Sequence, residues 1–191
     1  MNMLTDSHDA VTADWAAALL DFWFNQVGEE GWWKHDPELD RRCSLRFCSL
    51  WELKRTLAPD TFLERADDAL AAVLLFDQLP RNMFRGSAKA YQTDELARAV
   101  ARGAIAHGYD IQIGGAGRRF FYMPFQHSEE LDDQTLSLSL FEATGDERSI
   151  EFARQHHAMI ARFGRFPHRN AVLGRATLPE EKEAIAAAAH W

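Results

Sequence analysis

The stretch TFLERADDALAAVLLFDQLP, residues 61–80, shows the pattern that dominates the chain. Ala66, Ala69 and Ala72 recur every three residues and are followed by an apolar run at residues 73–76, so a helix is predicted over 61–79. Pro80 has no amide hydrogen and its ring clashes with the preceding turn, so we expect a kink or a stop there.

Helical periodicity continues on both sides of this stretch. A helix is predicted to begin at Asp36-Pro37, with the apolar stripe Leu39, Cys43, Phe47, Leu50 and Leu53. Further helices are predicted at residues 13–26, 93–108, 118–126, 128–145, 149–163 and 177–191. Thr93 and Ser128 are expected to cap their helices, Thr177-Leu178-Pro179-Glu180 is typical of a capping box, and residues 114–117 are expected to form a flexible connection.

Seven or eight helices with short loops and no convincing strand predict an all-α fold. The natural arrangement of such helices is a stack of antiparallel helical hairpins. No linker long enough to divide the chain is present, so we expect one domain over 1–191, with residues 1–10 as a flexible amino-terminal tail.

Composition excludes several classes of protein. The chain has 191 residues with 21 basic and 29 acidic side chains, and its net charge of −8 argues against a protein that binds the nucleic-acid backbone. No apolar run is long enough to span a bilayer, so no membrane partner is expected. Residues 1–10 lack the features of an export signal, which predicts a cytoplasmic location. Cys43 and Cys48 match no zinc or redox spacing and are predicted to be reduced thiols.

Three stretches place charged side chains among aromatic ones, and the first is DQLPRNMFRG at residues 77–86. Arg81 and Arg85 are four residues apart and would share a face of a helix that resumes after Pro80. Two guanidinium groups in that position suit a carboxylate or a phosphate. The alternative is that Asp77 and the two arginines form an ion-pair network that only stabilises the fold.

The second stretch is FFYMPFQHSEE at residues 120–130. His127 lies beside a helix start with Glu129 close behind it, so it is a candidate proton donor or acceptor. His127 and Glu130 are close enough in sequence to share a metal, but helix capping accounts for Ser128, Glu129 and Glu130 equally well. No stretch has the spacing of a dedicated metal site, so neither a metal nor a cofactor is predicted.

The third stretch, RFGRFPHRNAVLGR at residues 162–175, holds four arginines and a histidine without any acidic residue. Such a block either neutralises carboxylates elsewhere in the protein or presents a positive pocket to an anionic ligand. We favour a mixture, in which some arginines are paired structurally and one or two are free.

These motifs identify a family resemblance. LLFDQLPRNMFRG (74–86), FYMPFQHSEELDDQ (121–134) and the third stretch resemble the bacterial domain-of-unknown-function 924 family, and Phe22-Trp23-Phe24 and Trp32-Trp33 look like its amino-terminal pattern. The resemblance implies an all-helical, tetratricopeptide-like superhelical fold and carries no reaction, substrate or cofactor. The positions that match the family pattern are Asp77, Arg81, Asn82, Arg85, Tyr122, His127, Ser128, Glu129, Gln134, Arg165, His168, Arg169, Asn170 and Arg175. After Arg175 the chain departs from the family, because Ala176-Thr177 leads into an alanine-rich helix.

Three functions are compatible with this pattern. In the first, the motifs converge on a polar pocket for a small anionic molecule, which Arg81, Arg85, Arg165 and Arg169 bind, Asn82, Gln134 and Asn170 orient, and Tyr122, Phe125 and Phe166 enclose. In the second, the pocket is an enzyme site, with His127 or His168 as general acid or base and Glu129 as the orienting or catalytic carboxylate. In the third, the helices bind an acidic peptide, with Trp33 or Phe166 as exposed anchors. The oligomeric state is not readable from the sequence.

Overall fold

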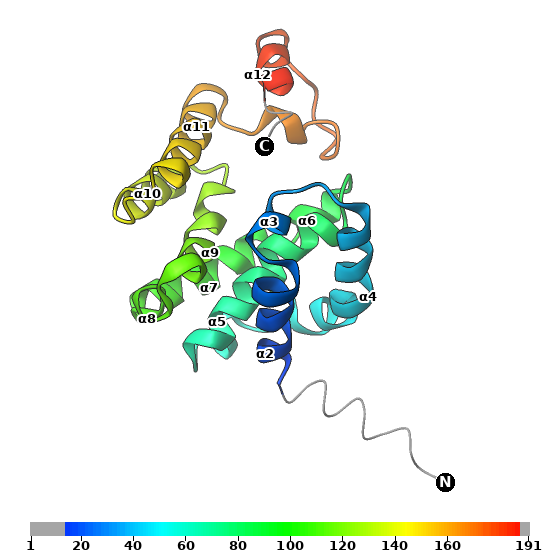
Figure 1. The fold of residues 1–191 in the computed structure, drawn as a ribbon. Helices are drawn as coiled ribbons and strands as arrows, with labels where there is room; N and C mark the ends of the chain where they lie inside the picture. Colours follow the sequence, from blue (N-terminus) through cyan, green and yellow to red (C-terminus); the bar gives the residue numbers. More distant parts are fainter. Residues whose placement is uncertain (1–13, 188–191) are drawn as a thin grey trace.

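The computed structural model describes residues 14–187, which form helices joined by short turns (Figure 1). The α-helices are α2 (Trp15–Leu20), α3 (Glu29–Trp32), α4 (Pro37–Lys54), α5 (Ala66–Val73), α6 (Leu79–Met83), α7 (Asp94–Ala106), α8 (Tyr109–Ile113), α9 (Gly115–Gln126), α10 (Leu131–Glu142), α11 (Glu147–Phe163) and α12 (Lys182–Ala187). The 3-10 segments are η2 (Pro59–Phe62), η4 (Ala88–Tyr91), η5 (Pro167–Arg169) and η6 (Pro179–Glu181), and the π-helical segments are η1 (Asp21–Val27) and η3 (Leu74–Gln78). No strand occurs between residues 14 and 187, and the predicted all-α class is confirmed.

The hydrophobic core is centred on α5 and η3. Every residue from Ala69 to Phe76 is buried, and α5 packs against α2, α7, α8 and α9. α10 packs against both α9 and α11, and α10 and α11 lie side by side in Figure 1, as expected for a helical hairpin. The tetratricopeptide-like superhelix stays a prediction. None of the helices between residues 14 and 187 has the length and apolar character needed to cross a membrane.

Several predicted helix boundaries are confirmed. Asp36 accepts a hydrogen bond from the amide of Glu38 at 2.8 Å and caps α4, whose first residue is Pro37. Gly164 ends α11 with a φ of 65°, a left-handed conformation that glycine adopts without strain. The expected tail at 1–10 and the end of the last helix at Trp191 lie outside the described residues.

The predicted helix over 61–79 is wrong at both ends. A 3-10 turn at residues 59–62 precedes α5, which begins only at Ala66. At the other end the helix does not stop at Pro80. The π-helical segment η3 leads directly into α6, which includes Pro80 and ends at Met83. In an α-helix the carbonyl of Phe76 would lack the amide that Pro80 cannot supply, and here it accepts a 2.7 Å hydrogen bond from the hydroxyl of Thr93.

This use of Thr93 also corrects the predicted cap of α7. Thr93 occupies the N-cap position, but its hydroxyl makes no cap hydrogen bond. It donates to Phe76 and accepts a 3.1 Å hydrogen bond from the indole of Trp51. A hydroxyl that was expected to stabilise its own helix therefore joins three distant segments.

The predicted flexible connection at residues 114–117 is wrong as well, since α9 begins at Gly115. Gly117 lies inside the helix, where a Cβ atom would be only 2.5 Å from Cγ2 of Ile113 and 3.2 Å from Cδ2 of Leu70. The glycine therefore permits close packing of α9 on α5 and α8. Ser128 was predicted to cap the next helix, but α10 begins later, at Leu131, with Glu130 as its N-cap residue.

Candidate functional site

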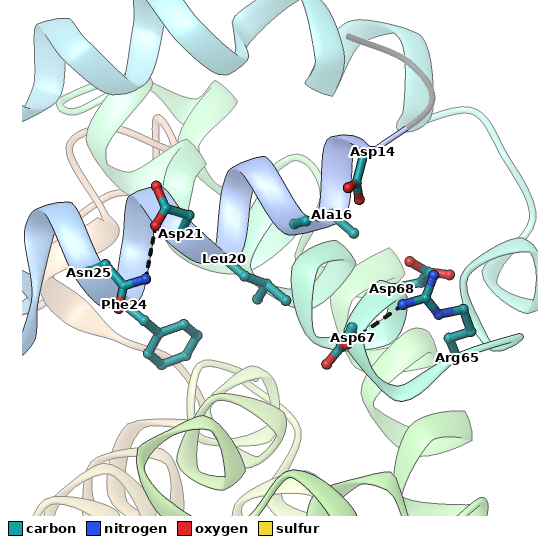
Figure 2. A pocket seen from close by; sticks show the side chains of 10 residues that line it. Asp14, Ala16, Leu20, Asp21, Phe24, Asn25, Arg65, Asp67 and Asp68 are labelled. Atoms are coloured by element: carbon teal, nitrogen blue, oxygen red, sulfur yellow. Dashed lines mark hydrogen bonds and ion pairs between the residues drawn. The ribbon is translucent and has the colours of Figure 1, made fainter. Parts of the chain in front are cut away.

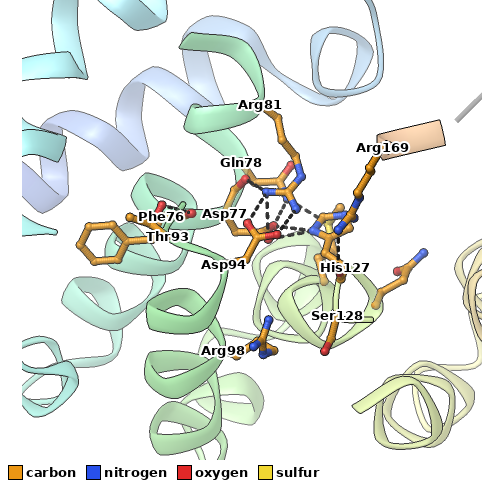
Figure 3. Close-up of polar contacts among 12 residues, drawn as sticks. Phe76, Asp77, Gln78, Arg81, Thr93, Asp94, Arg98, His127, Ser128 and Arg169 are labelled. Atoms are coloured by element: carbon orange, nitrogen blue, oxygen red, sulfur yellow. Dashed lines mark hydrogen bonds and ion pairs between the residues drawn. The ribbon is translucent and has the colours of Figure 1, made fainter. Parts of the chain in front are cut away.

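The three polar motifs meet where η3 and α6, the end of α9, and η5 come together. Figure 3 shows the side chains of Asp77, Arg81, His127 and Arg169 converging from these elements. Asp94 at the start of α7 completes the group. We call these five residues the central cluster.

Asp77 is the fully buried member of the central cluster. It lies in the π-helical segment η3, a type of turn that often occurs at functional sites. Nδ1 of His127 lies 2.8 and 3.0 Å from its two carboxylate oxygens, and the amide nitrogen of Gln78 donates to it at 2.5 Å. Burial opposes ionisation of Asp77, but the charge of Arg81 and the contacts with His127 and Gln78 outweigh burial and lower its pKa to about 2.

Arg81 is paired with two carboxylates. Its guanidinium lies 3.3 Å from Asp77 and donates two 3.1 Å hydrogen bonds to the oxygens of Asp94, and it also donates to the backbone carbonyl of Asp77. Burial alone would lower the pKa of Arg81, but Asp77 and Asp94 raise it above its ordinary value. Arg81 is thus paired with carboxylates of the protein itself, as in the ion-pair alternative for the first motif.

Arg169 lies in very different surroundings. It is only 7% exposed and its guanidinium packs over the rings of Tyr91 at 4.7 Å and Phe166 at 4.3 Å. Nη1 donates to the backbone carbonyl of His127 at 3.0 Å, and Nε has no hydrogen-bond partner. Among the described residues no carboxylate forms an ion pair with Arg169. Burial and the nearby charge of Arg81 lower its pKa to about 10.

Three histidines surround this cation in their neutral forms. Burial and the charge of Arg81 lower the pKa of His127. Burial is also the main cause that lowers the pKa of His168 to about 4, with Arg169 adding to it, and the pKa of His156 to about 3. Near neutral pH these imidazoles are therefore uncharged. The carboxylates of Asp94 and Glu129 favour the charged form of Arg169 without forming an ion pair with it.

Two other arginines of the third motif, Arg165 and Arg175, anchor the segment after α11. Arg175 donates two hydrogen bonds to Glu129, at 2.7 and 3.0 Å, and the same carboxylate accepts from the amide of Phe166 at 2.9 Å. Glu129 is thus held by Arg175, whereas the carboxylate that contacts His127 is Asp77. For His127, the carboxylate in contact is Asp77 and not the expected Glu129.

A second anchor is buried at the end of the chain. Glu181 accepts from Arg165 at 2.6 Å, from the amide side chain of Asn170 at 3.0 Å, and from the backbone of Leu178 at 2.7 Å. The bond to Leu178 is half of a capping box, one residue later than the predicted Thr177–Glu180 box. Arg165 and Asn170 are thus bound to the protein itself.

Arg85 and Asn82 do not join Arg81. Arg85 donates to both oxygens of Asp40 on α4, at 2.7 and 2.9 Å, and Asn82 donates to the same carboxylate at 2.8 Å. The predicted fork of Arg81 and Arg85 on one ligand is not formed here, since each arginine has its own carboxylate partner.

Three further predicted residues belong to separate networks. Ser128 donates to Asp133 at 2.8 Å, and Gln134 donates to backbone carbonyls of Gln126 and Ser128 at 2.7 and 2.6 Å, which fixes the turn before α10. Tyr122 is fully buried and donates to Asp110 at 2.6 Å, in contact with α8.

Phe166, predicted as a possible exposed anchor for a peptide, is also fully buried, whereas Trp33 is 47% exposed. Among the described residues no three His, Cys, Asp or Glu side chains are grouped as a metal site.

Sequence reasoning missed the partners of the motifs. Asp40, Tyr91, Asp94 and Glu181 lie outside the three stretches or at their edges, and each contacts a motif residue. Asp40, Asp94 and Glu181 carried only the signal of an acidic first turn of a helical segment, and Tyr91 carried none.

Two hollows in the surface lie elsewhere. One, of about 350 Å³, lies beside α2 and the start of α5 and is lined by Asp14, Asp21, Asp67 and Asp68 among others (Figure 2). The other, of about 440 Å³, is lined by residues 64–67, Tyr109 and Gln112. Neither contains a predicted site residue.

Comparison with known proteins identifies the family. The profile of a family described as "Bacterial protein of unknown function (DUF924)" matches residues 19–188. A solved structure, of a protein of unknown function from Agrobacterium tumefaciens, is 39% identical, with a TM-score of 0.86 over 91% of this chain and 98% of that chain. No curated protein matches. The motifs, the fold and both comparisons agree, and the chain belongs to the bacterial family DUF924.

Proposed function

We propose that the protein binds a small anionic ligand at the central cluster, with Arg169 as the principal contact. The observation that carries this proposal is the charge of Arg169, which is buried and has no carboxylate partner among the described residues. A buried cation without an ion pair costs several kcal/mol. A bound anion would supply a direct ion-pair partner and accept the hydrogen bond that Nε of Arg169 can donate.

Access to the cluster favours this role. The side chain of Arg81 is 21% exposed and that of His127 is 13% exposed, so the cluster reaches the surface although Asp77 beneath them is sealed. Arg81 and Arg169 both contact the ring of Tyr91, so two guanidinium groups lie close to the same side chain.

The competing explanation is that Arg169 only fastens η5 to the protein. Its hydrogen bond to His127 and its packing between Tyr91 and Phe166 are compatible with that role. The two explanations differ in what they predict for ligands, because only the first requires an anion.

Native mass spectrometry of protein purified without added ligand tests the proposal. We expect a retained small anion, which a denaturing run identifies, and we expect Arg169→Gln to lose it. Arg162→Gln is the matched control, because it removes the same charge from an exposed position in the same motif. Equal ligand content in wild type and Arg169→Gln, or polypeptide mass alone in both, contradicts the proposal.

A second candidate function, acid–base catalysis on that anion, is favoured by the contact between His127 and Asp77. A histidine oriented by a buried carboxylate is a recurrent arrangement for a general base. Turnover of the identified anion that His127→Gln abolishes, with its pH profile, supports this candidate. Unchanged turnover in His127→Gln excludes it.

A further inference from the structure

The two nitrogens of His127 have different environments. Nδ1 contacts both oxygens of Asp77, which also receives hydrogen bonds or ion pairs from Gln78 and Arg81. A carboxylate surrounded by donors can only accept, so the hydrogen of a neutral His127 is on Nδ1. Nε2 then has a free lone pair and acts as an acceptor.

Nε2 of His127 has no hydrogen-bond partner among the described residues, and the side chain is partly exposed. Burial and the charge of Arg81 lower the pKa of His127, which keeps this nitrogen unprotonated near neutral pH. The cluster therefore holds an acceptor on the ring of His127 and donors on Arg169, whose Nη1 contacts the backbone carbonyl of the same residue.

We propose that the anion bound at the central cluster is an oxyanion that carries its own hydrogen, of which hydrogen phosphate is the simplest member. This inference rests on the proposed function. Oxygens without hydrogen accept from Arg169, and the hydroxyl of the same ligand donates to Nε2 of His127. Near neutral pH inorganic phosphate keeps at least one hydrogen, whereas sulfate has none and would place an oxygen lone pair against that of Nε2.

The test compares inorganic phosphate with sulfate by isothermal titration calorimetry at neutral pH and equal ionic strength. Wild-type protein is expected to bind phosphate roughly tenfold to a hundredfold more tightly than sulfate, because an unsatisfied acceptor facing an anion costs about 1–3 kcal/mol. In His127→Gln the amide can present either a donor or an acceptor, so the preference is expected to disappear. His157→Gln is the control, because His157 contacts Thr135 and lies outside the cluster.

A second variant keeps the inference testable if His127→Gln fails to fold. In Asp77→Asn the side-chain amide can donate to Nδ1 of His127, which moves the ring hydrogen to Nε2 and is expected to strengthen sulfate binding relative to phosphate. Nitrogen NMR of the His127 ring reports the tautomer directly. A wild-type ring with its hydrogen on Nε2 overturns the inference.

The outcomes separate the two proposals. Equal affinity for phosphate and sulfate in wild type overturns the role of His127 and leaves the anion site intact. Absence of phosphate binding overturns this inference too, and the retained ligand with its loss in Arg169→Gln then decides the anion site independently.

Discussion

Arg81 on α6 and Arg169 on η5 face the same tyrosine ring, at 5.7 and 4.7 Å, but differ in their electrostatic surroundings. Arg81 has two carboxylate partners, which raise its pKa. Arg169 has a backbone carbonyl and two aromatic rings, and its pKa is lowered to about 10. Two arginines that contact the same ring therefore differ in electrostatic environment, and the position of the carboxylates makes the difference.

The largest effect is expected from Arg81→Ala. The change leaves Asp77 and Asp94 buried without their cation, and we expect the free energy of unfolding to fall by about 3–5 kcal/mol. Urea denaturation measures it. Arg41→Ala, which removes a surface pair with Glu38, should leave the midpoint nearly unchanged. If both variants shift the midpoint equally, the structural role given to Arg81 is wrong.

The second largest effect is expected from acid, which should lower the free energy of unfolding through the histidines around Arg169. His156 and His168 bind a proton near pH 6.5 when unfolded, but only near pH 3 and pH 4 when folded. Their stabilisation is complete above pH 6.5 and is lost as the pH falls toward 4, by about 1 kcal/mol per pH unit for each histidine.

Unfolding measured between pH 7 and 4.5, above the range in which most carboxylates titrate, reports on these two histidines together with His127, whose pKa is also lowered. His168→Gln should flatten the profile. A free energy of unfolding that stays constant over this range would contradict the lowered pKa of these histidines.

A smaller effect is expected from Arg175→Ala, which removes the two hydrogen bonds to Glu129. We expect a loss of about 1–2 kcal/mol. The loss should be confined to the segment after α11, so hydrogen exchange should quicken at residues 165–187 and remain slow in α5. Uniformly faster exchange across the chain would show that this segment unfolds together with the core.

The smallest change in stability is expected from Arg169→Gln, within about 1 kcal/mol, because the lost packing is offset by removal of a buried charge that has no ion-pair partner among the described residues. Thermal denaturation without ligand measures it, next to Arg81→Ala. A destabilisation as large as that of Arg81→Ala would remove the contrast between the two arginines.

Local features of the fold were predictable from the sequence. The cap at Asp36, the stop at Gly164 and the first part of the α4 stripe depend on neighbours within a few residues. The end of that stripe was wrong, because Leu53 is exposed and Trp51 is buried instead. The failures involved partners far along the chain. Thr93 looked like a helix cap because its use by the carbonyl of Phe76, 17 residues away, leaves no trace in local sequence.

The candidate site follows the same division. The motifs indicated which side chains are unusual, and the mixture of paired and free arginines was expected. Which arginine has no carboxylate depends on contacts such as Arg85 with Asp40, 45 residues apart, and Arg165 with Glu181. Only the assembled structure brings those carboxylates to their partners.

The π-helical segment η3 has a consequence for insertions and deletions. Each residue of an α-helix turns the chain by about 100°, so removing one residue between Ala69 and Phe76 would rotate the preceding helix relative to Asp77 and Arg81. The shortened chain could not keep both the packing of α5 in the core and the contact of Asp77 with His127. The number of residues in this helix therefore couples the packing of the core to the orientation of the Asp77 carboxylate.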